Sequence, residues 1–136
     1  MALPRIASMG LALLLGASAP AFAEEGNVDE GREVFKFRCW NCHMSPEGTL
    51  PEFPEQSTTP GPTMVGVIGR TAGTAEGYDY SDALQESGVV WTASTLTSWL
   101  REPRAFIPLN GMPFIGLKRA GEMEDVIAYL LATGRP

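Results

Sequence analysis

The chain has 136 residues, the size of one small domain. Acidic residues outnumber basic ones by 16 to 10, and the net charge of −6 argues against a nucleic-acid-binding protein, whose affinity depends on basic side chains. Apolar residues make up 44% and charged residues 19%, a composition typical of a globular protein and not of a disordered one.

Residues 1–23 have the pattern of a secretory signal peptide. Arg5 precedes the uncharged apolar run MGLALLL, and the small residues Ala21 and Ala23 stand at the positions that signal peptidase reads. A retained membrane anchor is the alternative, but the apolar run is shorter than the roughly 20 residues that a spanning helix needs. We expect cleavage after Ala23, export to the periplasm, and a single domain at residues 24–136 with no membrane span.

This domain is expected to be all-α, because no segment shows the sustained alternation of a strand. Capping residues, glycines and prolines mark the ends of the helices. The expected helices are Val28–Arg38, a short helix between Ser81 and Gly88, residues 96–102 capped by Thr92 or Ser94 and stopped before Pro103, and residues 122–133 ended by Gly134.

Directly after the first helix, Cys39-Trp40-Asn41-Cys42-His43 forms the C-x-x-C-H motif of covalent haem attachment. Two thiols at this spacing on a helical turn can each add to one haem vinyl group, and the adjacent histidine can coordinate the iron. A thioredoxin-like dithiol would need a preceding strand, a zinc site would need about four ligands, and a structural disulfide would leave the histidine unexplained. Covalent haem is the interpretation that accounts for all three residues.

His43 is the only histidine, so bis-histidine ligation within the chain is excluded and methionine is the natural second ligand. Met44 is too near the histidine, Met64 is expected on the histidine side, and Met123 lies in a helical core stripe. Met112 lies in IPLNGMPFIGLK, whose prolines and glycines exclude a regular helix. The apolar residues of this loop need an apolar surface to pack on, so Met112 is the expected ligand.

The sequence resembles class I cytochrome c, in the branch of the mitochondrial and soluble bacterial proteins. The segments that carry the resemblance span nearly all of residues 24–136 and are GREVF, CWNCH, Gly61-Pro62, VIGRTAG, GYDYSDA, Trp91, WLREPRAFIP, MPFIGLK and EDVIAYLLATG. The resemblance implies the cytochrome c fold, in which a few short helices and loops wrap around one covalently bound haem c.

The resemblance also implies which residues bind the cofactor. They are Cys39, Cys42, His43, Met112, Pro62, Arg70, Tyr80 and Trp91. The two cysteines would attach the haem, and the histidine and the methionine would ligate its iron. A carbonyl of the Gly61-Pro62 segment would accept a hydrogen bond from the histidine, and the last three residues would hold a buried propionate.

Four features depart from the family's pattern. Residues 44–60 form an insertion rich in proline and glutamate, which we interpret as a rigid, solvated loop, with a partner-binding element as the alternative. Trp99 replaces a tyrosine near the methionine sulfur. Leu84 and Asn110 replace an asparagine and a threonine that often hold a propionate, and Asn110 could take over that role.

The basic residues suggest where partners dock. The mitochondrial branch uses a lysine ring around the haem edge, whereas this chain has only two lysines. Four basic residues nevertheless fall on matching rim positions: Arg38, Arg104, Lys118 and Arg119. A small positive face on a negative body would steer encounter with an acidic partner surface. Alternatively, the four are ordinary solubilising charges.

These features predict a soluble periplasmic monohaem electron carrier, a monomer and not an enzyme, that exchanges electrons with transient redox protein partners. A dedicated cytochrome subunit or acceptor of one periplasmic dehydrogenase is the main alternative, motivated by the acidic balance and the insertion. The third hypothesis is a haem sensor or enzyme with an open iron site, which requires that Met112 does not ligate the iron.

Overall fold

The computed structural model describes residues 26–53 and 60–136, so the expected leader and residues 54–59 of the insertion lie outside the described residues. The helices of the described part are α1 Val28–Arg38, α2 Asp82–Gln85, α3 Ala93–Arg101, α4 Pro103–Phe106 and α5 Glu122–Thr133. β-Pairing among these residues is limited to two isolated bridges, which confirms the all-α prediction. No described helix has the length and apolar character needed to cross a membrane.

α1 and α5 have the predicted bounds, and the caps explain them. The side chain of Asn27 accepts hydrogen bonds from the backbone N–H groups of Asp29 and Glu30, which would otherwise lack partners at the start of α1. Gly134 ends α5, and its N–H donates to the Leu130 carbonyl. Ser81 caps α2, as its position before the short helix predicted.

The middle helices differ from the prediction in two places. α3 begins at Ala93, not at residue 96, because Thr92 forms a reciprocal capping box with Thr95. The helix ends at Arg101, one residue earlier than expected. α4 is a single turn that the sequence reading did not predict, and it begins at Pro103, a residue that suits the first turn of a helix.

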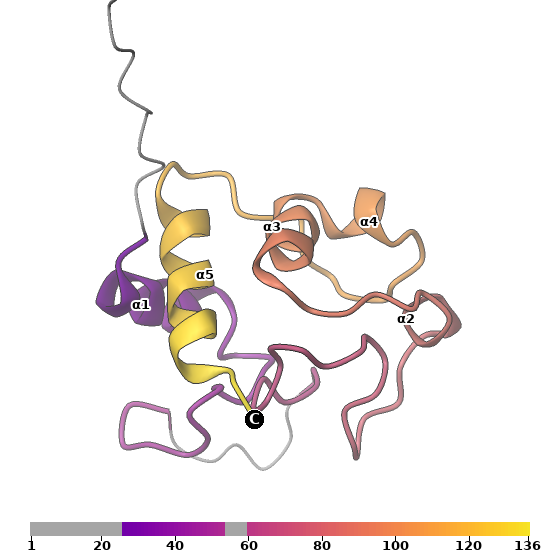
Figure 1. Ribbon diagram of the computed structural model, residues 1–136, viewed down its shortest axis with the longest axis horizontal. Helices are drawn as coiled ribbons and strands as arrows, with labels where there is room; N and C mark the ends of the chain where they lie inside the picture. Colours follow the sequence, from indigo (N-terminus) through magenta and orange to yellow (C-terminus); the bar gives the residue numbers. More distant parts are fainter. Residues whose placement is uncertain (1–25, 54–59) are drawn as a thin grey trace, which may run out of the picture.

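α1 and α5 cross at one side of the molecule, while α3, α4 and α2 lie on the other side of α5 (Figure 1). The crossing is close because Gly31 of α1 has no side chain: an added Cβ would lie 2.0 Å from the Asp125 carbonyl oxygen. Hydrogen bonds join both ends of α1 to the first turn of α5. Asn27 N–H donates to Asp125 Oδ1 over 2.7 Å, and the Arg38 guanidinium pairs with Glu122 over 3.0 Å.

Aromatic rings fill the core beside this crossing, and the insertion contributes to them. Phe35 of α1 packs against Tyr129 of α5 and against Phe53, with ring centroids 5.7 and 6.0 Å apart. Phe53 is buried, as are Ser45 and Pro46. The expectation of a solvated loop therefore holds for Thr49, Pro51 and Glu52, which are exposed, but not for these three buried residues.

Candidate haem-binding site

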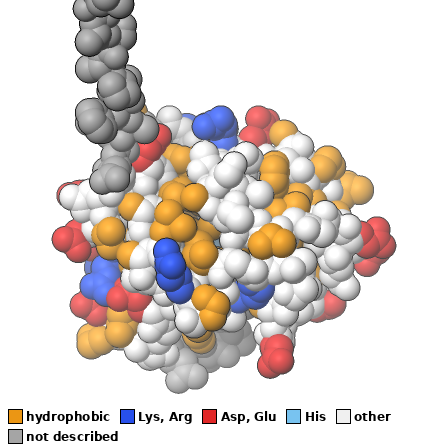
Figure 2. Space-filling model, viewed as in Figure 1, with side chains coloured by type: hydrophobic (Ala, Val, Ile, Leu, Met, Phe, Trp, Pro, Cys, Tyr) orange, Lys and Arg blue, Asp and Glu red, His pale blue; other side chains and the backbone are white. Residues whose placement is uncertain are grey.

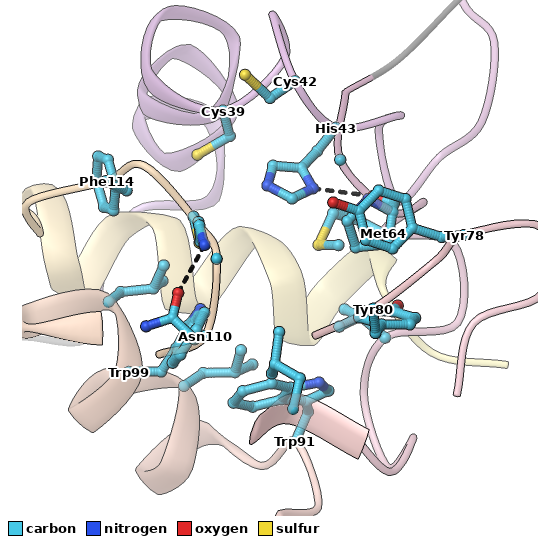
Figure 3. Close-up of a pocket in the computed structure, with 18 of the residues that line it drawn as sticks. Cys39, Cys42, His43, Met64, Tyr78, Tyr80, Trp91, Trp99, Asn110 and Phe114 are labelled. Carbon is cyan, nitrogen blue, oxygen red and sulfur yellow. Dashed lines mark hydrogen bonds between the residues drawn. The ribbon is translucent and has the colours of Figure 1, made fainter. Parts of the chain in front are cut away.

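One cavity of about 510 Å³ is lined by residues of α1, α2, α3 and α5 and of the loops between them. All eight residues expected to bind the cofactor line it, although they come from segments far apart in the chain (Figure 3). The remaining lining is largely apolar and includes Phe35, Leu96, Leu100 and Leu130. Such size and lining are typical of a site for a flat, largely apolar cofactor.

The thiols and the imidazole are brought to the cavity by a turn that follows α1. The N–H groups of Cys42 and His43 both donate to the Cys39 carbonyl, over 3.0 and 2.9 Å. This turn sets the two thiols and the imidazole along one edge of the cavity (Figure 3). The spacing of the motif thus places two nucleophilic sulfurs and one nitrogen donor together, as covalent haem attachment requires.

His43 is buried and its ring is fixed by a single hydrogen bond. Nδ1 lies 2.8 Å from the Pro62 carbonyl oxygen, so Nδ1 carries the proton and Nε2 keeps its lone pair. Burial lowers the pKa of His43, with the Pro62 hydrogen bond acting in the opposite direction, and a neutral imidazole is the form that binds a metal. The expected role of the Gly61-Pro62 carbonyl is matched by this contact.

Gly61 allows the segment to approach His43. A Cβ at this position would lie 2.7 Å from both the Cys42 carbonyl oxygen and His43 Cε1. The Gly61 N–H also donates to the Cys42 carbonyl over 2.7 Å. Any larger residue would push the Pro62 carbonyl away from the ring that it orients.

The thiols do not have the properties of a redox dithiol. Burial, together with the neighbouring Cys42, raises the pKa of Cys39 to about 12. Reactive dithiols have the opposite shift, because the thiolate is the attacking species. Both cysteines are free thiols in the described structure, which makes them available for attachment.

Of the methionines in the described residues, Met64 and Met112 line the cavity, and Met123 is buried in the core as predicted. Met64 lies beside His43 in Figure 3, and its backbone N–H donates to Met44, the residue after the histidine. Met64 is therefore on the histidine side, as expected. Met112 reaches the cavity from the loop after α4.

The three residues expected to hold a propionate lie at the cavity wall formed by loops 63–80 and by the start of α3. The Arg70 guanidinium donates to the carbonyls of Val65 and Thr63 over 2.8 and 2.7 Å, which fixes its charge beside the cavity. Burial raises the pKa of Tyr80, with the Arg70 charge opposing it. Trp91 is buried and packs against Trp99, with ring centroids 5.4 Å apart.

The residues that depart from the family's pattern also line the cavity: Leu84, Trp99 and Asn110. The side chain of Asn110 bonds to backbone groups of Pro103 in α4, of Ile107 and of Met112. The suggestion that it replaces a propionate-holding threonine stays a prediction.

Sequence comparisons agree with this geometry. The family model described as Cytochrome c matches residues 28–134. A cytochrome c 2.1 of Caenorhabditis elegans is 44% identical over 105 residues, 77% of this chain and 87% of the relative. A cytochrome c of Chlamydomonas reinhardtii is 40% identical over 114 residues, 84% and 92% of the two chains. A cytochrome c2 of Rhodomicrobium vannielii is 38% identical over 126 residues, 93% and 92% of the two chains.

The chain belongs to the cytochrome c family. It is a class I c-type cytochrome with the cytochrome c fold, and proteins of this family are electron carriers with one covalent haem c. The cavity fits that cofactor, because a paired set of thiols, a neutral imidazole and a thioether meet at one apolar site.

The four basic residues proposed for docking have different surroundings in this cytochrome c. Arg38 also lines the cavity but pairs with Glu122, and Lys118 donates to the Arg101 carbonyl over 3.0 Å. Arg104 and Arg119 are exposed. Acidic side chains lie mostly around the rim of the face in Figure 2, with hydrophobic side chains toward its middle.

Two further aromatic residues of the site were missed by the sequence reading. Phe114 and Tyr78 line the cavity and lie on opposite sides of it in Figure 3. Phe114 could have been found, because it lies in the same proline- and glycine-rich loop as Met112 and has the same need for an apolar surface. Tyr78 packs edge-on against Tyr80, a contact without a local sequence signal.

Proposed function

We propose that this cytochrome c is a periplasmic monohaem electron carrier whose haem is attached to Cys39 and Cys42 and ligated by His43 and Met112. The observation that carries the proposal is the single cavity that all four side chains line. Within it, His43 is held as a neutral donor by Pro62. The periplasmic location rests on the leader pattern of residues 1–23.

The two axial residues have complementary tasks. Haem iron, when bound, supplies a one-electron change between Fe(III) and Fe(II). The imidazole of His43 is oriented from behind by the Pro62 carbonyl, which also raises its basicity. Met112 approaches from the loop after α4, and a thioether ligand favours the reduced state and a high potential. Retaining both ligands in both oxidation states keeps the structural change on electron transfer small.

Arg70, Tyr80 and Trp91 are proposed to surround a buried propionate. The Arg70 guanidinium is held beside the cavity by two backbone carbonyls, so its positive charge can offset a carboxylate without moving. Trp91 and Tyr80 supply donor groups on the same wall. A fixed charge of this kind reduces the cost of burying a carboxylate in an apolar site.

Transient docking by redox partners at a small positive face is part of the proposal. All four of its basic residues are exposed, and Arg38 and Lys118 also make contacts within the chain. The described part of the insertion is anchored in the core through Phe53, while Thr49, Pro51 and Glu52 are exposed.

Paired methionine variants test the ligand assignment. Met112→Ala is expected to abolish the methionine–iron charge-transfer band of the ferric protein and to allow carbon monoxide to bind the ferrous protein. Met64→Ala is the matched control, because Met64 lines the same cavity from the histidine side and should leave the band in place. The assignment is wrong if Met112→Ala retains the band or if Met64→Ala loses it.

A further inference from the structure

Asn110 precedes Met112 by two residues in the loop after α4, and it is one of the few polar residues buried in the described part of the chain. Asn110 is 3% exposed, whereas the preceding Leu109 is 88% exposed. Burial of a polar amide is unfavourable unless its hydrogen bonds are satisfied. The contacts of Asn110 therefore show what a polar side chain contributes at this position.

The Asn110 amide is fully engaged with backbone groups on both sides of it. Nδ2 donates to the carbonyls of Pro103 and Ile107, over 3.0 and 2.8 Å. Oδ1 accepts from the Met112 N–H over 2.7 Å. Only one orientation of the amide fits, because two acceptors face one end and a donor faces the other. The side chain thus connects Met112 to α4 and to Ile107, the residue that follows α4.

The backbone beside Asn110 is strained. Leu109 has φ of +62°, a left-handed conformation that is unfavourable for residues other than glycine. Its side chain is exposed, so packing does not impose this conformation. The Ser81 hydroxyl, at the N-cap of α2, donates to the Asn110 carbonyl over 2.9 Å and fixes the loop backbone further. Strained backbone persists where surrounding contacts over-determine it, and the bonds of Asn110 supply those contacts.

We propose that Asn110 is the positioning residue that keeps Met112 at the cavity, and that its loss lets the strained loop relax and opens the iron's sixth position. This inference rests on the proposed ligation by Met112 and deepens it. Asn110 acts through its hydrogen bonds to α4 and to the loop backbone. This role differs from the contact with a propionate that the family resemblance suggested.

The test uses the holoprotein with Asn110→Ala, which removes all three side-chain hydrogen bonds. We expect a weakened or lost methionine–iron charge-transfer band in the ferric form. Carbon monoxide, which the closed site of the wild type excludes, should bind the ferrous form, because Met112 loses the hydrogen bond that holds its backbone. Leu109→Gly in the same background should restore part of the band, because glycine adopts positive φ without strain.

Asn27→Ala is the matched control, since it is the same replacement at another asparagine that accepts backbone hydrogen bonds. It should lower the unfolding temperature but leave the band in place and the ferrous site closed to carbon monoxide. The proposal is overturned if Asn110→Ala keeps the wild-type band and binds no carbon monoxide. It is equally overturned if Asn27→Ala opens the site to the same degree, because the effect would then be general destabilisation.

Amide hydrogen exchange separates this proposal from the ligation on which it rests. Exchange at the Met112 N–H should be faster in Asn110→Ala than in the wild type, since that N–H donates to Oδ1. Absence of the charge-transfer band in the wild type would refute ligation by Met112, and the exchange comparison would still report on the role of Asn110. Equal exchange in the two proteins would refute that role itself.

Discussion

Tyr129 shows how much one hydroxyl group can matter in a small core. Its ring packs against Phe35, and its hydroxyl donates to Glu47 Oε2 over 2.8 Å and lies 3.1 Å from Ser45 Oγ. Both Tyr129 and Ser45 are 1% exposed, so water cannot replace a lost partner. The hydroxyl therefore links α5 to the first residues of the insertion.

Two tyrosine variants test this at the residue scale. Tyr129→Phe should lower the free energy of unfolding by about 1–2 kcal/mol, because a buried partner is left with fewer hydrogen bonds. Tyr78→Phe removes a hydroxyl that donates to the exposed Pro60 carbonyl, and it should change stability by less than about 0.5 kcal/mol. Urea unfolding followed by circular dichroism measures both. Equal effects of the two replacements would contradict the role assigned to Tyr129.

At the scale of elements, Glu47 joins the insertion to both helices of the α1–α5 pair. The Arg32 guanidinium donates to both of its carboxylate oxygens, and Tyr129 donates to one of them. Burial alone would raise the pKa of Glu47, but the hydrogen bonds from Arg32 and Tyr129 outweigh it and hold the pKa below the usual 4.5. The folded state thus favours the ionised carboxylate.

A pH dependence follows with a definite sign. Because the pKa is lower in the folded state, Glu47 contributes stability above its unfolded pKa of about 4.5, and this is lost as pH falls through the lower folded value. Glu47→Gln should flatten the fall in stability below that pH, whereas Glu33→Gln on the exposed side of α1 should not. Thermal unfolding from pH 3 to 7, in about half-unit steps, measures it. Parallel curves for wild type and Glu47→Gln would refute this linkage.

The helices were predictable where caps and apolar periodicity lie within the same segment. α1 and α5 have such signals, and their bounds were predicted correctly. The start of α3 was misplaced because the sequence offered both Thr92 and Ser94 as caps, and only the reciprocal bonds between Thr92 and Thr95 decide between them. α4 is one turn long, too short for periodicity to indicate.

The site was predictable through its residue types and the family resemblance, and all eight expected residues line one cavity. The polar contacts that support the site were not predictable. Glu47 and Tyr129 are far apart in the sequence, and no local sequence pattern predicts their hydrogen bond. The hydrogen bonds of Asn110 were not predictable either, because its neighbours along the chain do not reveal that it faces the carbonyls of Pro103 and Ile107.

For the whole molecule, the net charge of −6 means that partner docking depends on where the few basic residues lie. Arg104→Glu and Arg119→Glu should slow electron exchange with a small anionic redox complex about two- to fivefold at low salt, because they reverse charge on the proposed face. Arg135→Glu makes the same change in net charge at the C-terminus and should have a smaller effect. Stopped-flow absorbance measures the rates.

High salt provides the second arm of that experiment. Screening should bring all the variants toward one rate, since exposed charges interact little beyond a Debye length. If Arg135→Glu slows the exchange as much as the other two variants do, net charge alone governs the encounter and the four basic residues are ordinary solubilising charges.

The central claim is that His43 and Met112 close both axial positions of a haem that carries electrons. An optical redox titration of the purified wild-type protein, with carbon monoxide added to the reduced form, tests it most directly. The account predicts a methionine–iron charge-transfer band, a clearly positive midpoint potential and no binding of carbon monoxide. A missing band with ready binding of carbon monoxide would contradict the account and would favour a sensor or an enzyme with an open iron site.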